Sequence, residues 1–448
     1  MNVKKLHVCV IGAGIVGACT AWELLQDGHQ VTILESGEPG GRQAASYGHG
    51  CWISPVSVVP MSMPGLWKKL PAYLLDPNGP VVIRFPSLFR LLPWLIRFLA
   101  AGWSTTRVQK TAKALASLLK DGPERHLNIA QALQQPAFIR REGLLYVYPD
   151  RSAFQAEQAA WDLRQLTGLA WQELDAEQLR AREPALSAHY KFGVLVPAGA
   201  YCIDPGAYVA ALIEACVANG AQLIKARATG FELIPRDVYT DQQAQGAPKA
   251  AAGQIKGSYQ DLKSVKTDQG EIVCDRAVIT AGIWSKSLAR MMGDRIPLES
   301  ERGYHAVIAN PEGGPHRSLM PSDGKMANTP TRQGLRLAGQ VELTALDAPA
   351  DWKRVDILLR HARRAYPGLP AGFEQTVDRW MGHRPSTPDG LPVIGESSRS
   401  PHVIYGFGHG HVGFASAPIT GRLAADLVSG KPPERRLTPF SPRRFRWF

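Results

Sequence analysis

The sequence predicts an α/β fold (α+β overall), with a parallel sheet built from separated segments and an antiparallel sheet elsewhere. Residues 7–35 show a buried strand run, a glycine-rich turn that opens a helix, and a second strand run, which together form a parallel βαβ unit. Residues 297–380 instead combine several strand patterns with one helical pattern, ADWKRVDILLRHARRAYPG. That combination is typical of an antiparallel sheet covered by a helix.

The first βαβ unit carries a dinucleotide-binding motif. After the strand HVCVI, Gly12 permits a tight turn, Gly14 lets the backbone approach a pyrophosphate, and Gly17 allows close packing of helix on strand. The N–H groups at the helix start favour phosphate charge. Glu35 ends the second strand, QVTILE, where a carboxylate accepts hydrogen bonds from a ribose diol. A glutamate there, in place of an arginine, argues against a 2′-phosphate and leaves NAD or FAD.

The next segment, GGRQAASYGHGCWISP at residues 40–55, favours FAD. An NAD-binding domain would usually continue with another βα unit, whereas a loop of small residues suits close approach of backbone to a flat ring system. The predicted cofactor contacts in this half of the chain are Gly12, Gly14, Ile15, Val16, Gly17, Glu35, Ser36, Arg42, Ala45, Ser46, Gly48, His49 and Gly50.

Two later glycine turns extend the predicted cofactor site. In GEIVCDRAVITAGIWSKSL a buried strand ends near Gly282 and a helix follows, although an ordinary βα turn has the same pattern. In YGFGHGHVGFASAPITGRLAADLVSG a helix is predicted to begin near Val412 or Gly413, and its dipole would stabilise negative charge on a reduced flavin. The predicted contacts here are Gly408, His409, Gly410, His411, Val412 and Gly413.

The histidine pair in this turn has an alternative interpretation as a metal site. His409 and His411 are one residue apart, but no cluster of carboxylates or cysteines accompanies them. We therefore predict no metal, and interpret the turn as a flavin contact made largely through backbone groups, with His411 bordering the substrate.

The middle of the chain is predicted to be helical, with helices in 105–133, 152–168 and 175–186. Between the first two, AFIRREGLLYVYPD is interpreted as a strand pair or hairpin arm. Asp204 is predicted to cap a helix that starts at Pro205 and runs to about Asn219, with Gly220 as its C-cap. Residues 235–270 are interpreted as a loop within a hairpin region.

Composition limits the partners. The net charge is +12, which favours acidic partners such as anionic lipid, nucleic acid or carboxylate substrates. Nucleic acid ranks last because no recognised nucleic-acid-binding signature is present. The six cysteines are scattered without a CxxC pair, and reduced cytosolic thiols fit a chain of this size.

Segment 81–103 is the best candidate for contact with a membrane. Three arginines and two prolines interrupt its apolar residues, so it is predicted to form one or two basic amphipathic helices and not a span. The N-terminal apolar run is too short for a targeting signal. We therefore expect a cytoplasmic protein, with peripheral contact to the inner membrane through 81–103 as an open alternative.

Taken in order, the motifs resemble the FAD-dependent D-amino-acid dehydrogenase branch of the glycine oxidase, sarcosine oxidase and D-amino-acid oxidase superfamily. The similarity covers nearly the whole chain and rests on VIGAGIVGACTAWEL…VTILE, ASYGHGCWISP, PLESERGYH, WMGHRPSTPDGLPVIG and GFGHGHVGFASAPITGRLAADLVSG. The resemblance implies a discontinuous FAD-binding domain (1–56, 191–296 and 381–448) and a substrate-binding domain (57–190 and 297–380). It also implies non-covalent FAD, hydride transfer from an α-amino acid to flavin N5, release of a 2-oxo acid and ammonia, and a quinone acceptor.

The resemblance also implies catalytic residues. Arg384 in MGHRPSTPDG stands where the family binds the substrate carboxylate, and a guanidinium can grip a carboxylate with two hydrogen bonds. His383 departs from the leucine expected before that arginine. Tyr304 and His305 lie where related enzymes place residues over the substrate side of the flavin; for Tyr304 a purely structural role is the alternative.

The motifs leave several activities open. An oxygen-using glycine, sarcosine or D-amino-acid oxidase, a D-hydroxyproline dehydrogenase and an L-amino-acid deaminase would all need FAD, a carboxylate clamp and an apolar pocket. A flavin-containing tRNA-modifying protein, from a different functional class, would use the positive charge instead.

Overall fold

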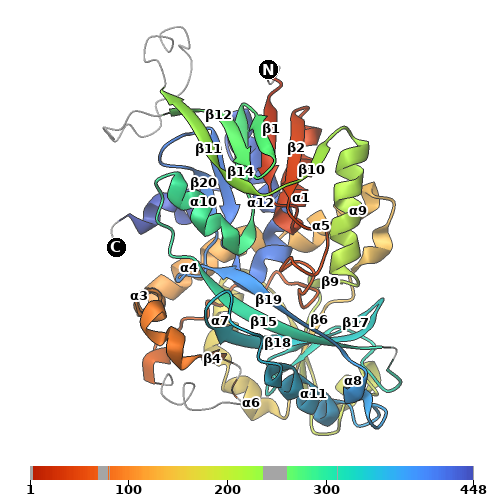
Figure 1. Ribbon diagram of the computed structural model, residues 1–448. Coiled ribbons are helices and arrows are strands. Elements are labelled where there is room, and N and C mark those ends of the chain that lie inside the picture. Colours follow the sequence, from red (N-terminus) through yellow and green to blue (C-terminus); the bar gives the residue numbers. More distant parts are fainter. Residues whose placement is uncertain (1–3, 69–78, 80, 236–259, 310, 447–448) are drawn as a thin grey trace.

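A computed structural model describes residues 4–68, 79, 81–235, 260–309 and 311–446. The glycine motifs lie at one sheet, drawn in the upper half of Figure 1, with strand order β10-β2-β1-β14-β21-β20. The first five strands run parallel and β20 pairs antiparallel with β21. The strands are β1 (His7–Ile11), β2 (Gln30–Glu35), β10 (Gln222–Lys225), β14 (Arg276–Ile279), β20 (Val393–Glu396) and β21 (Val403–Phe407).

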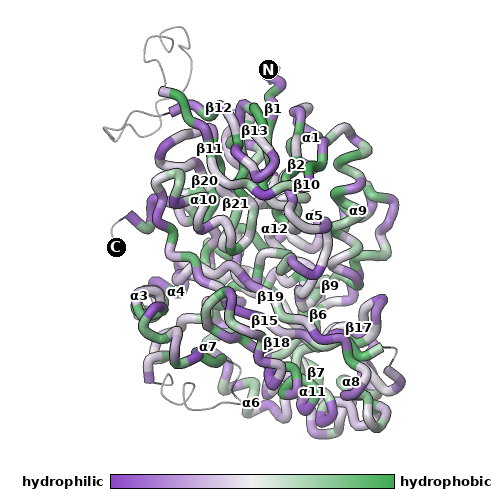
Figure 2. The backbone as a smooth tube through the Cα atoms, viewed as in Figure 1, coloured by the Kyte–Doolittle hydropathy of each residue, from purple (hydrophilic) through white to green (hydrophobic). Residues whose placement is uncertain are grey.

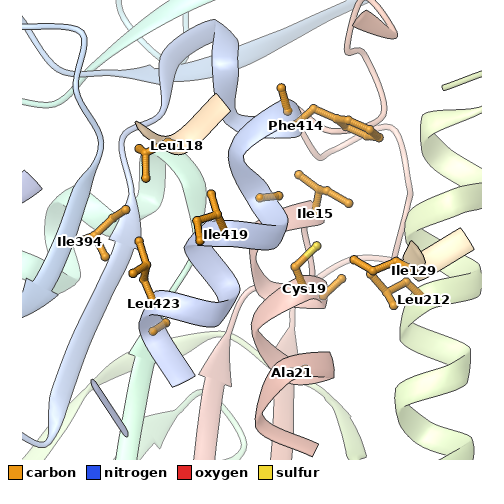
Figure 3. Packing of buried hydrophobic residues seen from close by; sticks show 14 of the residues in the cluster. Ile15, Cys19, Ala21, Leu118, Ile129, Leu212, Ile394, Phe414, Ile419 and Leu423 are labelled. Atoms are coloured by element: carbon orange, nitrogen blue, oxygen red, sulfur yellow. The ribbon is translucent and has the colours of Figure 1, made fainter. Parts of the chain in front are cut away.

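Alternate residues of these strands enter two separate cores, as the two-residue period of a strand dictates. Val8 and Val10 pack with helices α1 (Ile15–Gln26), α9 (Pro205–Ala218) and α12 (Gly413–Ser429). In Figure 3, side chains of α12 and α1 point toward one another beside α9. Cys9 and Ile11 face the other core, which includes α10 (Ser285–Met291) and the antiparallel strands β11 (Ala228–Pro235), β12 (Gln260–Thr267) and β13 (Gly270–Val273).

The second large sheet is mostly antiparallel and lies in the lower half of Figure 1, in the order β19-β15-β18-β17-β16-β6-β8-β7, with β4 paired to β18. Helix α11 (Lys353–Ala365) covers one face of it through Val355, Leu358 and Ala362. The helix is both purple and green in Figure 2, as expected for a helix with one buried face. The strands are β4 (Val81–Ile83), β6 (Leu144–Tyr148), β7 (Gln172–Leu174), β8 (Phe192–Val196), β15 (Glu299–Ile308), β16 (Leu319–Pro321), β17 (Ala327–Thr331), β18 (Gly334–Leu343) and β19 (Asp378–Ser386).

A small sheet, in the order β3-β9-β5, and several helices complete the fold. The remaining elements are β3 (Trp52–Ile53), β5 (Ile139–Arg140), β9 (Ala200–Cys202), α3 (Leu88–Ala101), α4 (Thr105–Leu119), α5 (Gly122–Ala132), α6 (Arg151–Gln155), α7 (Gln158–Leu166) and α8 (Ala176–Arg182), with short 3₁₀ turns η1 (Phe85–Ser87), η2 (Pro136–Phe138), η4 (Gly282–Trp284), η5 (Phe373–Gln375), η6 (Gly410–Val412), η7 (Thr438–Phe440) and η8 (Pro442–Phe445).

Several predicted elements are confirmed. Asp204 caps α9 by accepting a hydrogen bond from the Ala207 N–H, and Pro205 is the first helical residue. The helix ends at Ala218, and Gly220 adopts a φ of +95° just beyond it. Most of the predicted loop at 235–270 lies outside the described residues; the part that is described belongs to β11, β12 and β13.

The predicted hairpin arm at 137–150 is wrong. Its two strands belong to different sheets, because β5 pairs with β9 whereas β6 pairs with β8 and β16. Strand propensity identified both segments, but the partner of a strand depends on contacts with residues far away in the sequence.

Chain segments also divide between the two sheets differently from the predicted domain boundaries. Strand β8 lies within 191–296 and strand β19 crosses position 381, yet both pair in the large antiparallel sheet. Helices α4 and α5, within 57–190, instead pack Leu118 and Ile129 against the α1–α12 core (Figure 3). A short apolar strand carries no local signal for which sheet it joins.

Segment 81–103 forms strand β4, turn η1 and a single helix, α3, that continues through Pro93. Helix α3 is at the left edge of Figure 1. Within the described part of the chain, no helix has both the length and the apolar character required to cross a membrane.

Candidate active site

A cavity of about 1030 Å³ lies between the two large sheets. Its walls come from the glycine turn after β1, the loop at 43–50, the turn before α12, strands β15, β18 and β19, and the inner face of α3. Ligand pockets usually measure ~300–1,000 Å³, so this cavity is large enough for a dinucleotide together with a small substrate.

The glycine motif forms one end of the cavity. Gly12 adopts a φ of +103°, a conformation that side-chain-bearing residues rarely take. A Cβ on Gly17 would lie 1.8 Å from the Gly12 carbonyl oxygen, so the packing of α1 on β1 requires glycine there. Glu35 holds the turn, because its carboxylate accepts hydrogen bonds from the N–H groups of Ala13 (2.8 Å) and Gly37 (2.9 Å).

The loop after Glu35 joins the two sheets. The Ser46 hydroxyl accepts a hydrogen bond of 2.9 Å from the Ile15 N–H at the start of α1. Arg42 does not line the cavity: its guanidinium forms an ion pair of 2.7 Å with Asp378 and donates to the Arg379 carbonyl. The Trp380 indole in turn donates to the Arg42 carbonyl at 2.8 Å. Arg42 therefore fastens the loop to β19.

The two histidines of the late glycine turn have different surroundings. The buried His409 ring contacts the Thr420 hydroxyl at 3.0 Å, whereas His411 opens to the cavity. Burial lowers the pKa of His409 to about 3. Although His411 is exposed toward the cavity, desolvation by the surrounding protein, followed by the charge of Arg384, lowers its pKa to about 4. Both rings are therefore neutral at neutral pH.

His49 adds a third neutral ring to this wall. It stacks on Phe414 with the ring centroids 4.8 Å apart, and burial followed by the charges of Arg384 and Arg336 lowers its pKa to about 3. Its Nδ1 is buried and makes no hydrogen bond with the described residues. An unpaired buried nitrogen in a cavity wall fits a hydrogen bond to a bound polar ligand.

Arg384 lies on β19 and also lines the cavity. Its guanidinium donates to the Gln340 carbonyl at 3.0 Å and to the Gly339 carbonyl at 3.5 Å. It covers Gly303, where a Cβ would lie 2.3 Å from Nη2. Gln340 has a φ of +58° at a register shift between β15 and β18, and such bulges re-aim backbone groups near functional sites.

Glu301 is the cavity residue that the sequence reasoning missed. It is directly opposite Arg384 in the β15–β19 ladder and is 5% exposed. Burial raises the pKa of its carboxyl above the ordinary value, an effect that Arg384 and Ser386 oppose. The segment PLESERGYH holds several charged residues, so residue type alone did not single out Glu301.

The structure does not bring Tyr304 or His305 to the cavity surface. The Tyr304 hydroxyl donates to Glu342 at 2.5 Å and accepts from the Asp351 N–H at 3.0 Å, on the α11 side of the sheet. The physical reason is strand alternation: Glu301 faces the cavity, so a residue three positions later faces away. The His305 ring stacks on Trp380, which does line the cavity, at 5.0 Å between ring centroids.

Most of the predicted cofactor contacts do converge on the cavity. Those that line it are Gly12, Gly14, Ile15, Val16, Glu35, Ser36, Ala45, Ser46, Gly48, His49, Gly50, Gly282, His409, Gly410, His411, Val412 and Gly413. Gly17, Arg42 and Gly408 lie outside the lining. His383, which departs from the family motif, also lines the cavity. Lining residues that sequence reasoning did not anticipate include Trp284, together with Trp94, Leu95 and Phe98 of α3.

These residues fit FAD. Helices α1 and α12 both begin at the cavity without a cap from the side chain of the N-cap residue and without an acidic residue in the first turn. Apart from the Ile15 N–H, which donates to Ser46, the N–H groups of their first turns and their positive dipole ends can face an anionic ligand. The cavity connects these two helix starts with Arg384. The sequence is matched by a family model, DAO, described as FAD dependent oxidoreductase, over residues 7–427.

The chain belongs to this family of FAD-dependent oxidoreductases. It is 48% identical over 440 residues to a D-amino-acid oxidase of Bradyrhizobium diazoefficiens, covering 98% of this chain and 99% of that protein. It is 29% identical over 446 residues to D-amino acid dehydrogenase 2 of Ralstonia nicotianae, covering 97% and 99%.

Solved structures of low sequence identity share the fold. The glycine oxidase of Geobacillus kaustophilus superposes with a TM-score of 0.66 at 21% identity, covering 98% of this chain and 99% of that chain. The L-proline dehydrogenase of P. horikoshii superposes with a TM-score of 0.70 at 18% identity, covering 99% and 98%. The predicted fold class, enzyme class and cofactor are thus confirmed.

Proposed function

We propose that this FAD-dependent oxidoreductase oxidises D-amino acids to 2-oxo acids and ammonia. The observation that carries this proposal is the position of Arg384, a partly buried guanidinium in the wall of the cavity that FAD would occupy. Carboxylate is the substrate group that such a cation binds most specifically.

Arg384 would orient the substrate. Two of its N–H groups donate to the carbonyls of Gln340 and Gly339, which fixes the plane of the guanidinium and leaves other N–H groups for a carboxylate. Because Gly303 has no side chain, the guanidinium can lie flat on β15. Restricting the substrate to one orientation contributes strongly to rate in reactions whose chemistry a cofactor supplies.

The nucleotide end of the cavity would hold FAD through Gly12, Gly14 and Glu35, with the starts of α1 and α12 facing its anionic groups. When bound, FAD would accept the two electrons of the substrate Cα–H bond as a hydride, so that the Cα–N single bond becomes a C=N double bond. The neutral rings of His49 and His411 add no positive charge to the wall at neutral pH. Water then hydrolyses the released imino acid.

The D-configuration is proposed from the relatives. Both the protein at 48% identity and the protein at 29% identity are named for D-amino acids. For the electron acceptor we favour a membrane quinone, because one face of α3 forms the cavity wall through Trp94 and Phe98 while its opposite face exposes Phe89 and Ile96. An apolar acceptor dissolved in lipid would have a short path to the site.

Oxygen is the second candidate acceptor. The relative with 48% identity is named an oxidase, whereas the relative named D-amino acid dehydrogenase 2 shares 29%. Rapid mixing of the substrate-reduced enzyme with oxygen and with a short-chain quinone would distinguish the two by rate of flavin reoxidation.

Anaerobic flavin reduction tests the proposal. The purified holoenzyme should lose its yellow absorbance when mixed with at least one D-amino acid from a panel of D- and L-amino acids, glycine, sarcosine and hydroxyproline. Arg384→Ala should keep FAD but need a far higher substrate concentration, by about a hundredfold or more if a desolvated charge pair is lost. Reduction by L-amino acids alone would contradict the stereochemical assignment, and unchanged kinetics in Arg384→Ala would reject the clamp.

A further inference from the structure

We propose that Glu301 binds the α-ammonium group of the amino-acid substrate and accepts its proton, while Arg384 binds the carboxylate of the same molecule. This inference rests on the proposed function, because it requires an amino-acid substrate in the cavity. It adds a second charged residue to the site and explains how the reactive neutral amine is produced.

The geometry matches the two charges of an amino acid. Glu301 and Arg384 are directly opposite each other in the β15–β19 ladder, and both line the cavity. Side chains at opposite positions start from Cβ atoms about 4.5–5.5 Å apart. An α-amino acid carries its ammonium and carboxylate on a single carbon, so one substrate molecule can meet both residues.

Glu301 lacks the ion pair that a structural carboxylate of this sheet makes. Glu342, which is equally buried, accepts from the guanidinium groups of Arg84 and Arg302 and from Tyr304. Arg384 donates instead to two backbone carbonyls, and no described cation lies within 4.0 Å of Glu301. Burying a carboxylate without a cation is costly, so such a residue is best explained by a charged ligand.

The charges around Glu301 leave it free to act as a base. On its own strand, Glu299 is paired with Arg90 and Lys286, and Arg302 pairs with Glu342 on the other face. From β19, Arg384 opposes the rise in the pKa of Glu301 that burial causes. From the turn before α12 and the loop after β2, His411 and His49 are neutral at neutral pH.

The proton transfer balances without a further reactant. One N–H bond of the ammonium breaks and one O–H bond forms on the Glu301 carboxylate, which turns a zwitterion and a carboxylate into a neutral amine and a carboxylic acid. The nitrogen lone pair that this step uncovers is required for oxidation of the Cα–N bond. The proton leaves to water when the product is released.

The test compares ligands with and without an amino group on the holoenzyme. Its probes are the D-amino acid that reduces the flavin fastest and the carboxylic acid with the same side chain but no amino group. For Glu301→Gln at pH 7.5 we expect the KM of the amino acid to rise at least about tenfold, the loss expected for one buried charged hydrogen bond. The dissociation constant of the des-amino acid, measured by the change in flavin absorbance, should stay within about twofold or tighten.

The pH profile of kcat/KM distinguishes proton transfer by Glu301 from a purely structural role, which would leave that profile unchanged. In the wild type, kcat/KM should fall as pH decreases through the pKa of Glu301, because the protonated carboxyl cannot take the ammonium proton. This acid limb should be lost in Glu301→Gln and restored by Glu301→Asp. A limb that moves only in His411→Asn, or an equal weakening of both ligands in Glu301→Gln, would overturn the inference.

The two proposals fail in different ways. If no α-amino acid bleaches the wild-type flavin, the proposed function is wrong. If the wild type is bleached but Glu301→Gln keeps the wild-type KM and acid limb, only the role of Glu301 is wrong.

Discussion

Gly303 shows how a single residue without a side chain shapes the site. The guanidinium of Arg384 lies against this position of β15, in the space that a Cβ would need. The Gln340 carbonyl accepts a hydrogen bond from Arg384, and the backbone of Gln340 has a positive φ. The orientation of the proposed carboxylate clamp therefore depends on the missing side chain of Gly303 and on the backbone conformation of Gln340.

Gly303→Ala should impair substrate binding more than stability. The new methyl group would stand 2.3 Å from the guanidinium of Arg384, the far end of a flexible side chain, so Arg384 would move while the strand remains. We expect the KM for the amino acid to rise by about tenfold or more, with a change in Tm of only a few degrees. Gly230→Ala is the matched control, because the nearest atom to its Cβ is the Met291 sulfur at 4.0 Å. A Tm loss in Gly303→Ala with unchanged KM would contradict this account.

At the scale of one element, helix α3 has two apolar faces with different surroundings. Leu91, Trp94 and Leu95 are buried, and Trp94 and Leu95 line the cavity. On the opposite face, Phe89, Leu92 and Ile96 are exposed at helical spacing, and the chain next to the helix exposes Phe85 and Trp103. In the sequence, exposed cations on either side of this stripe include Lys68, Arg107 and Lys110. An apolar stripe with flanking cations is typical of helices that lie in the interface of an anionic membrane.

Charges placed on this stripe should abolish membrane binding without affecting the site. For Phe89→Glu combined with Ile96→Glu, we expect loss of flotation with vesicles that contain anionic lipid. Placing a carboxylate in the membrane interface costs free energy, and the negative lipid headgroups repel it. Flavin reduction by the amino acid should be unchanged.

Val273→Glu is the control, since Val273 is also exposed, at 68%, but belongs to β13. Wild-type protein that floats equally with neutral and anionic vesicles, or not at all, would contradict the proposed contact of α3 with an anionic membrane.

At the scale of the whole molecule, neutral buried histidines link stability to pH. His126, between Tyr208 and the Phe414 carbonyl, has its pKa lowered to about 4 by burial, and His409 to about 3. In the unfolded chain these rings take up a proton near pH 6.5, whereas the folded protein does so only below about pH 4. The unfolded state thus gains protons first as the pH falls, so acidification favours unfolding.

We expect the Tm of the holoenzyme to fall steadily from pH 6.5 to pH 4. Each of these two histidines would contribute up to about 1.4 kcal/mol per pH unit in that window. His126→Gln should reduce the slope of Tm against pH, while the exposed His189→Gln should leave it unchanged. A Tm that is constant over this window in the wild type would show that these rings are protonated in the folded protein.

The sequence alone determined the nucleotide half of the site. Gly12, Gly17 and Glu35 are constrained by local geometry: one turn, one helix start and one strand end within about thirty residues. Contacts of this kind lie close in the chain, so residue type and spacing specify them. The helix start at Gly413 and the cap at Asp204 were predictable for the same reason.

Only the tertiary structure decided the substrate half. Glu301 meets Arg384 because β15 and β19 pair in one register, and Tyr304 turns away from the cavity because of that same alternation. The sheet that β8 joins and the face that α3 turns to the cavity likewise depend on distant partners. A shift of one residue in strand register would turn Glu301 and Tyr304 each to the opposite face of the sheet. Register is set by packing across the whole sheet, which local sequence does not record.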